Sequence, residues 1–151
     1  MKILELDSLT PGEREFWVSR MEKTDWDAGG WLADLAGKDK IESTFGVGSK
    51  VLILTDDENL VSFCTLAVQD EIDDMSMTPW IGFVYTFPQY RGKRCSGKLI
   101  EYAISLAAEQ GNKKVYVSSE EIGLYEKYGF TYLKTADSVH GYKTRIYVRE
   151  I

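Results

Sequence analysis

The N-terminal part of the chain alternates between apolar and polar residues and then changes to a helical pattern. Lys2–Leu6 alternates with the period of a β-strand, so a short strand is predicted there. The segment Thr10–Glu13 reads Thr-Pro-Gly-Glu, in which threonine and glutamate form a capping box around a proline at the first helical position. A second short helix is predicted over Asp27–Ala36, ended by Gly37.

The middle of the chain is rich in β-forming residues. Two apolar stretches, Lys50–Thr55 and Leu60–Gln69, flank a turn-forming Asp-Asp-Glu-Asn cluster, which predicts an antiparallel hairpin. After a polar connection, Trp80–Phe87 predicts another strand, bracketed by Pro79 and Pro88 because proline cannot donate to a sheet ladder.

The residue pattern of the C-terminal third of the chain predicts two helices and three strands. Apolar residues recur at helical spacing from Leu99 to Ala107 before Gly111, and Lys114–Val117 predicts a strand. Ser118 and Glu121 form a second predicted capping box, here for a helix over Ile122–Tyr128. The final predicted strands are Thr131–Leu133 and Thr144–Arg149. This order of elements predicts one α/β domain over residues 1–151, built on a mixed sheet.

Length and composition narrow the class of protein. The 151 residues, of which 44% are apolar, suit one compact domain. No apolar run approaches the roughly 18 residues of a membrane span, and the N-terminus lacks a signal peptide's features. Cys64 and Cys95 form no motif and suit a reducing compartment. We therefore expect a cytoplasmic protein with no membrane partner.

The charges are unevenly distributed. Eighteen basic and 24 acidic residues give a net charge of −6, which argues against nucleic acid as a partner. Between Val51 and Tyr90 there is no lysine or arginine, and then four cations follow within eight residues: Arg91, Lys93, Arg94 and Lys98. A dense basic cluster in an acidic chain indicates a local site for a small polyanion.

The basic cluster lies where a predicted strand gives way to a predicted helix. Unpaired N–H groups at a helix N-terminus bind phosphate, and Gly92 and Gly97 let the backbone approach it closely. Cations at this end oppose the helix dipole, which favours a bound anion over the alternative of a capped helix with an exposed basic turn.

The same segment also fits a nucleotide-binding loop in part. Gly92–Lys98 matches G-x-x-x-x-G-K. The next residue is Leu99, where that loop needs a hydroxyl on Mg²⁺, and no later strand ends in the aspartate that would hold the metal. A P-loop-like nucleotide-binding enzyme is therefore the less favoured interpretation.

Two segments carry a family resemblance. Phe87–Lys93, leading into a helix, resembles the acyl-coenzyme A signature of the GNAT N-acetyltransferase superfamily, and Leu124–Phe130 is similar to its second signature, L-Y-x-x-x-G-F. The resemblance implies a mostly antiparallel sheet flanked by helices, with a splayed central strand pair that binds the cofactor. It also implies transfer of acetyl from the co-substrate acetyl-CoA, without a metal, to a primary amine by direct attack in a ternary complex.

The resemblance assigns roles to particular residues. Backbone groups of the strand would pair with the pantetheine arm and polarise the thioester carbonyl, and the turn after it would hold the pyrophosphate. Tyr125 would protonate the departing thiolate; the alternative for this side chain is core packing. The cofactor-binding residues implied are Val84, Tyr85, Thr86, Arg91, Gly92, Lys93, Arg94, Cys95, Ser96, Gly97 and Ser118.

The sequence departs from the family pattern in the phosphate-binding turn. Arg94 and Ser96 stand at two positions where the family usually has glycine or alanine, and Ser118 stands where many relatives carry asparagine. We expect Arg94 to contact a phosphate directly and Ser96 to cap the helix. A non-catalytic acyl-CoA-binding sensor is the alternative function.

The acceptor and the base that deprotonates it are less defined. Carboxylates considered as the base are Glu71, Asp73, Asp74 and, more weakly, Glu120, whereas His140 is expected to be an exposed loop residue. In the family, the acceptor cleft would be lined here by Trp26, Trp31, Asp70–Pro79 and Asp137–Tyr142. Acids and aromatics suit a cationic small-molecule or peptide amine, unless the tryptophans are core anchors and the acids solvated. A homodimer is left open.

Overall fold

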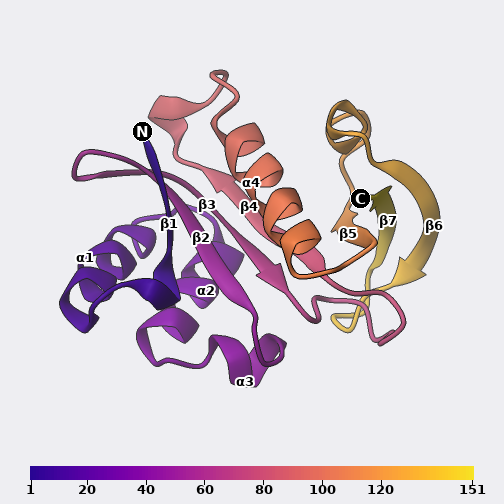
Figure 1. Cartoon of the computed structure of the whole chain (residues 1–151), viewed down its shortest axis with the longest axis horizontal. Coiled ribbons are helices and arrows are strands. Elements are labelled where there is room, and N and C mark those ends of the chain that lie inside the picture. Colours follow the sequence, from indigo (N-terminus) through magenta and orange to yellow (C-terminus); the bar gives the residue numbers. More distant parts are fainter.

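The computed structural model describes residues 1–151 and contains one seven-stranded sheet in the order β1-β2-β3-β4-β5-β7-β6 (Figure 1). The strands are β1 (Lys2–Glu5), β2 (Lys50–Asp56), β3 (Asn59–Ala67), β4 (Trp80–Thr86), β5 (Lys114–Ser119), β6 (Thr131–Asp137) and β7 (Lys143–Glu150). The α-helices are α1 (Pro11–Met21), α2 (Asp27–Gly37), α3 (Ile41–Phe45) and α4 (Cys95–Glu109), and the 3₁₀ helices are η1 (Leu6–Ser8), η2 (Pro88–Tyr90) and η3 (Tyr125–Tyr128).

Helices cover both faces of the sheet. Helix α4 packs on one face, and α1 and α2 pack on the other (Figure 1). The alternation of side chains along β2 explains both cores, since Leu52 and Leu54 face α4 while Val51 and Ile53 face α1 and α2. Being apolar on both faces, β2 reads as a continuous hydrophobic run in the sequence.

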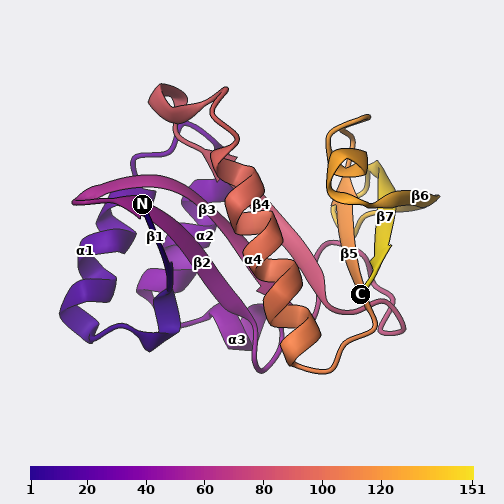
Figure 2. The ribbon, with the colours of Figure 1, turned by 45° about the horizontal axis from the view of Figure 1, so that its top comes forward.

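The sheet opens between β4 and β5. These two strands form the only parallel pair, and their register contains just Trp80 opposite Tyr116 and Ile81 opposite Val117. Figure 2 shows β5, β6 and β7 diverging from the end of β4. The predicted mixed, mostly antiparallel sheet with a splayed central strand pair is therefore confirmed.

A bulge in β4 lies beside this opening. Phe63 pairs with Tyr85 and Thr65 pairs with Gly82, so two residues of β4 stand opposite the single residue Cys64. Phe83 in the bulge has a φ of 51°, which is rare for a residue with a side chain. The bulge redirects the strand at the point where it loses contact with β5.

Most predicted elements are present, and local signals explain them. The Thr10–Glu13 capping box and the β2–β3 hairpin are confirmed. The helix predicted over Ile122–Tyr128 is wrong, because only the 3₁₀ helix η3 forms and neither Ser118 nor Glu121 caps it. Helix α3 was not predicted. None of the helices has both the length and the apolar character needed to cross a membrane.

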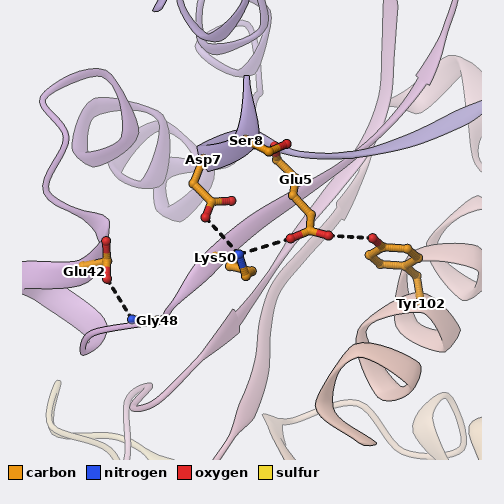
Figure 3. Close-up of polar contacts among 7 residues, drawn as sticks. All are labelled: Glu5, Asp7, Ser8, Glu42, Gly48, Lys50 and Tyr102. Carbon is orange, nitrogen blue, oxygen red and sulfur yellow. Dashed lines mark hydrogen bonds and ion pairs between the residues drawn. The ribbon is translucent and has the colours of Figure 1, made fainter. Parts of the chain in front are cut away.

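A polar network joins β1, β2, η1 and α4 (Figure 3). Lys50 Nζ lies 2.9 Å from Asp7 Oδ2 and 3.1 Å from Glu5 Oε1. The second oxygen of Glu5 accepts a 2.7 Å hydrogen bond from the Tyr102 hydroxyl of α4. We call Glu5, Asp7, Lys50 and Tyr102 the Lys50 network. The hydrogen bond to Asp7 is the main reason that the pKa of Lys50 is raised.

Candidate active site

A cavity of about 1000 Å³ occupies the opening between β4 and β5. Its walls come from the start of α2, the β3–β4 connection, β4, the end of β5, η3 and the β6–β7 loop. A volume of this size accommodates a cofactor-sized ligand. The splay of the two strands therefore creates this cavity beside β4 backbone that has no strand partner on the β5 side.

The basic turn after β4 leads from this cavity into α4. Arg94 precedes the helix with a left-handed backbone, φ 58° and ψ 28°, and makes no side-chain cap. This is a conformation that glycine adopts without strain, so the backbone at position 94 has a glycine-like conformation although the residue is arginine. The side chains of Lys93 and Arg94 are exposed and form no ion pair.

Arg91 is held more tightly than the other cations. Its Nε donates a 2.9 Å hydrogen bond to the Thr86 carbonyl, and its guanidinium carbon lies 5.4 Å from the centre of the Tyr85 ring. Arg91 lines the cavity, whereas the Lys98 ammonium lies 4.0 Å from the Met1 sulfur and is not part of the lining. All four cations are exposed, but of these only Arg91 lines the cavity.

Three residues of the turn differ from the expected roles. Ser96 lies inside α4 and is not its cap, so that prediction is wrong, but it does line the cavity. The Cys95 side chain is buried in the core, which leaves only its backbone for a ligand. A Cβ at Gly97 would lie 2.6 Å from the Tyr128 hydroxyl oxygen, so packing against η3 by itself explains the glycine.

Val84, Tyr85 and Thr86 all line the cavity. They follow the last β4 residue that pairs with β5, so no strand covers this stretch of backbone on that side. The Tyr85 side chain packs in the core on the α1 and α2 face, and its hydroxyl donates a 2.6 Å hydrogen bond to Asp25. That hydrogen bond is the main reason that the pKa of Asp25 is lowered.

Tyr125 combines core packing with access to the cavity. Its ring is buried, makes an edge-to-face contact with Phe130 at 6.0 Å, and also belongs to the cavity lining. Burial raises the pKa of Tyr125 well above that of a free tyrosine, and nearby acidic groups act in the same direction. The hydroxyl therefore remains protonated at neutral pH and is able to donate.

Ser118 takes part in a hydrogen-bonded group around Glu71. Its hydroxyl donates to Glu71 at 2.8 Å and lies 3.0 Å from the Thr144 hydroxyl oxygen. The Tyr142 hydroxyl donates to the other carboxylate oxygen of Glu71. The pKa of Tyr142 rises to about 12, first through burial and then through Glu71. Ser118 lines the cavity, but its hydroxyl is already engaged in holding Glu71.

Of the four carboxylates considered as a base, only Glu71 lines the cavity. Asp73 and Glu120 are exposed outside it. Asp74 accepts hydrogen bonds from the Ser76 hydroxyl and N–H, which lower its pKa.

Asp70, the first residue of the expected acceptor segment but not one of the carboxylates considered as the base, also lines the cavity. The signal that identifies it is Gly82, because an isolated glycine within a strand marks a close approach by another group.

Of the residues expected around the acceptor, those that line this cavity are Trp26, Trp31, Asp70, Glu71, His140 and Tyr142, whereas the rest of Asp70–Pro79 and Asp137–Tyr142 is not part of the lining. Trp26 stacks on Tyr85 with ring centres 6.0 Å apart, and Trp31 lies 6.0 Å from Phe83. Both tryptophans are more than a third exposed, so they form a wall of the cavity and are not core anchors. His140 is exposed, as expected, and stacks on Tyr142 at the rim.

The lining is rich in carboxylates. The four acidic side chains that line it are Asp25, Asp70, Glu71 and Glu121, and Arg91 is the only lysine or arginine among the lining residues. The negative potential of such a wall attracts a cation. No cluster of three or more His, Cys, Asp or Glu side chains has the arrangement of a metal site.

Comparison with known proteins identifies one family. Residues 47–132 match the acetyltransferase (GNAT) domain, a segment that includes β4, the basic turn, α4 and η3. No curated protein sequence matches the chain.

Solved structures share the whole fold at low sequence identity. The aminoglycoside 6'-acetyltransferase type Ii superposes with a TM-score of 0.72 at 16% identity, covering 99% of this chain and 97% of that one. The aminoglycoside 6'-N-acetyltransferase from Enterococcus faecium gives 0.69 at 14% identity, with the same coverages of 99% and 97%. The PaiA N-acetyltransferase from Thermoplasma acidophilum, solved in complex with coenzyme A, gives 0.65 at 16% identity over 100% of both chains.

Proposed function

The chain belongs to the GNAT acetyltransferase family, and from this premise we propose that it transfers acetyl from acetyl-CoA to a primary amine of a cationic acceptor. The observation that carries the proposal is the cavity between β4 and β5. It brings together an uncovered stretch of strand, a basic turn, a protonated tyrosine and an acidic, aromatic wall.

The features of the chain fit acetyl-CoA. The thioester supplies a carbonyl carbon that an amine can attack. Residues Val84–Thr86 offer backbone groups to the pantetheine arm, because β5 leaves this part of β4 uncovered. The proposed pyrophosphate site is the start of α4, which follows the left-handed Arg94, because the first N–H groups of a helix have no partner within it and stabilise phosphate. Exposed Lys93 and Arg94 supply the counter-charge.

Tyr125 is proposed as the residue that protonates the leaving thiolate. Its raised pKa keeps the proton on oxygen until sulfur, whose own pKa as a thiol is about 8.5, leaves as an anion beside it. Position matters more than acidity here, because a phenol gives up its proton to a thiolate only within hydrogen-bonding reach. The core packing of the ring supplies that positioning.

The acceptor is proposed to be a cationic amine. Four lining carboxylates face one arginine, and the exposed ring faces of Trp26 and Trp31 add cation–π attraction. Small-molecule amines and lysine-bearing peptides both satisfy this chemistry.

The test is thiol release from acetyl-CoA with spermidine, kanamycin, lysine and a lysine-containing peptide as acceptors. We expect release with at least one amine and a loss of about 10²–10⁴-fold in kcat for Tyr125→Phe. Tyr116→Phe is the matched control, since Tyr116 is buried but lies outside the cavity. Binding of acetyl-CoA without thiol release from any amine would instead support the acyl-CoA sensor.

A homodimer is also proposed. Strand β6 is an edge of the sheet and is exposed along almost its whole length, including the large side chains Tyr132 and Leu133. An exposed edge with apolar residues favours pairing with another chain. Sedimentation equilibrium should show a dimer, and Leu133→Lys should shift it toward the monomer.

A further inference from the structure

The carboxyl group of Asp70 reaches the cavity through a gap in β4. Asp70 follows the end of β3, and its Oδ2 occupies the space where a side chain at Gly82 would begin, so that a Cβ at Gly82 would overlap it. Any residue other than glycine at position 82 must displace the carboxyl. Because Gly82 has no side chain, the carboxyl group of Asp70 from the β3–β4 connection fits against β4 at this position.

The polar atoms at this point are incompletely paired. Asp70 Oδ1 accepts a 2.8 Å hydrogen bond from the Glu71 N–H, while Oδ2 has no hydrogen-bond partner in the chain. The Thr65 hydroxyl is buried without a partner and lies 3.2 Å from the same Cβ position of Gly82. Because Asp70 lines the cavity and its Oδ2 has no partner in the chain, this oxygen can accept a hydrogen bond or a proton from a ligand in the cavity.

The surroundings of Asp70 favour its protonated form. Burial, with the charge of Glu71 as a second cause, raises the pKa of Asp70 to about 7. The other titratable side chains that line the cavity, besides Glu71 and Arg91, are Asp25 before α2, Tyr85 on β4, Glu121 after β5, Tyr125 on η3, and His140 and Tyr142 from the β6–β7 loop. Arg91 lines the same cavity, but its Nε is bonded to the end of β4. A carboxyl group in this setting takes up and releases a proton near neutral pH.

We propose that Asp70 is the catalytic residue that accepts the proton of the attacking amine, an inference that rests on the proposed acetyl transfer. The neutral amine nitrogen forms a bond to the thioester carbonyl carbon, and its proton passes to Asp70 Oδ2. The C–S bond then breaks with its electron pair on sulfur, which takes a proton from Tyr125. Asp70 loses its proton to solvent and Tyr125 regains one, so the cycle balances.

Glu71 has a different part in this arrangement. Its two carboxylate oxygens accept hydrogen bonds from Ser118 and Tyr142, so neither is free to take a proton from an amine. Its charge helps to hold the pKa of Asp70 high. Glu71 and Gly82 are therefore positioning residues: the first adjusts the proton affinity of Asp70, and the second makes room for its carboxyl.

The first test compares Asp70→Asn with the wild type, using the amines named above as acceptors. The asparagine keeps the shape but cannot take a proton, so kcat/KM should fall by about 10²–10⁴-fold while the Kd for acetyl-CoA, measured by calorimetry, is unchanged. The wild-type pH profile should rise to a plateau with an apparent pKa near 7, and the variant should lack this limb. Asp73→Asn, an exposed acid of the same connection, should leave both unchanged.

A second readout does not depend on turnover. In protein labelled with ¹³C at aspartate carboxyls, the signal that disappears in Asp70→Asn should titrate near pH 7 in the wild type. Gly82→Ala should move that titration toward ordinary aspartate values and lower kcat/KM, because the new methyl group expels the carboxyl from the gap.

The outcomes separate the two proposals. Full activity and an unchanged pH limb in Asp70→Asn, with an active wild type, would overturn the role of Asp70 and leave the acetyl transfer standing. A carboxyl that titrates near pH 4 in the wild type would also overturn that role. No thiol release by the wild type with any of the amines would overturn both.

Discussion

Two carboxylate-bearing clusters of this protein differ in how completely their polar groups are paired: the Lys50 network, and the cavity cluster of Asp70 and Thr65. In the Lys50 network, the ammonium of Lys50 contacts Asp7 and Glu5, and Glu5 also accepts a hydrogen bond from Tyr102. In the cavity, Asp70 receives a single backbone hydrogen bond, and the Thr65 hydroxyl beside it receives none. Both clusters attach to the same sheet, so the difference lies in the partners and not in the scaffold.

The contrast separates charges that stabilise the fold from charges available for chemistry. A paired charge gains little by leaving its partner, whereas an unpaired buried group destabilises the fold and binds whatever satisfies it. Pairing also determines the pH at which each cluster responds. The pKa of Lys50 is raised above 10.5, while that of Asp70 is raised into the neutral range. Of these two groups, only Asp70 therefore changes its charge near pH 7.

The largest expected effect is on stability when Asp70 is replaced by asparagine. Between pH 3.8 and about 7, folded Asp70 holds a proton that the unfolded chain has lost, so its ionisation destabilises the fold as pH rises through this window. Asp70→Asn removes this pH-dependent loss of unfolding free energy, because asparagine does not ionise. The variant should match the wild type below pH 4 and exceed it in unfolding free energy by up to about 4 kcal/mol above pH 7.

Urea unfolding at a series of pH values measures this difference, with Asp73→Asn as the control. A stability difference that stays constant with pH would show that folding does not raise the pKa of Asp70. The proposed difference between the two clusters in their response to pH would then be wrong.

A smaller effect of opposite sign is expected from Lys50→Met. The change leaves Asp7 and Glu5 without their cation and should lower the unfolding free energy by about 1 kcal/mol, because Lys50 and Glu5 are partly buried. The loss should be constant from pH 6 to pH 9, since Lys50 stays protonated throughout. Acetyl transfer should be unaffected.

Lys38→Met is the matched control for this cluster. The Lys38–Asp34 pair is more than half exposed at both ends, so its loss should cost about 0.5 kcal/mol or less. An equal loss from both lysine variants would mean that the Lys50 network contributes no more than an isolated surface pair.

The smallest effect is expected for two hydroxyls on β3. Ser62 donates to the Tyr85 carbonyl at 2.5 Å, so Ser62→Ala should destabilise the fold by about 1 kcal/mol. Thr65 has no partner to lose, and Thr65→Val should be neutral or stabilising by less than about 1 kcal/mol. Thermal unfolding of both variants measures the difference, and a destabilising Thr65→Val would reveal a hydrogen bond at that site.

Much of the fold was predictable because its signals are local. The capping box at Thr10 acts over three residues, and the β2–β3 hairpin follows from a turn between two apolar runs. The failed prediction over Ile122–Tyr128 has a non-local cause. Ser118 had the right spacing for a cap, but it lies on β5 and donates to Glu71, which is 47 positions away in the chain.

The candidate site was predictable only in part. The strand with its basic turn and Tyr125 lie in two contiguous segments of the sequence. Val84–Thr86, Arg91, Ser96 and Tyr125 line one cavity, whereas Lys93 and Arg94 are not among its lining residues. Asp70 escaped notice because nothing near it in the sequence distinguishes it from Asp73 or Asp74. Asp70 differs from Asp73 and Asp74 because its carboxyl group occupies the position that a side chain at Gly82 would take. That contact forms only when β3 and β4 are paired.

The order of elements, the family resemblance and the basic turn follow from the amino-acid sequence alone, because periodicity, caps and charge spacing act between near neighbours in the chain. The tertiary structure decided which charges are paired and which are not. Lys50 meets Asp7 across 43 residues, and Asp70 meets the gap at Gly82 across a strand pair. Burial and pairing change a carboxyl's proton affinity by several pKa units, and both depend on contacts that form only when distant segments pack together.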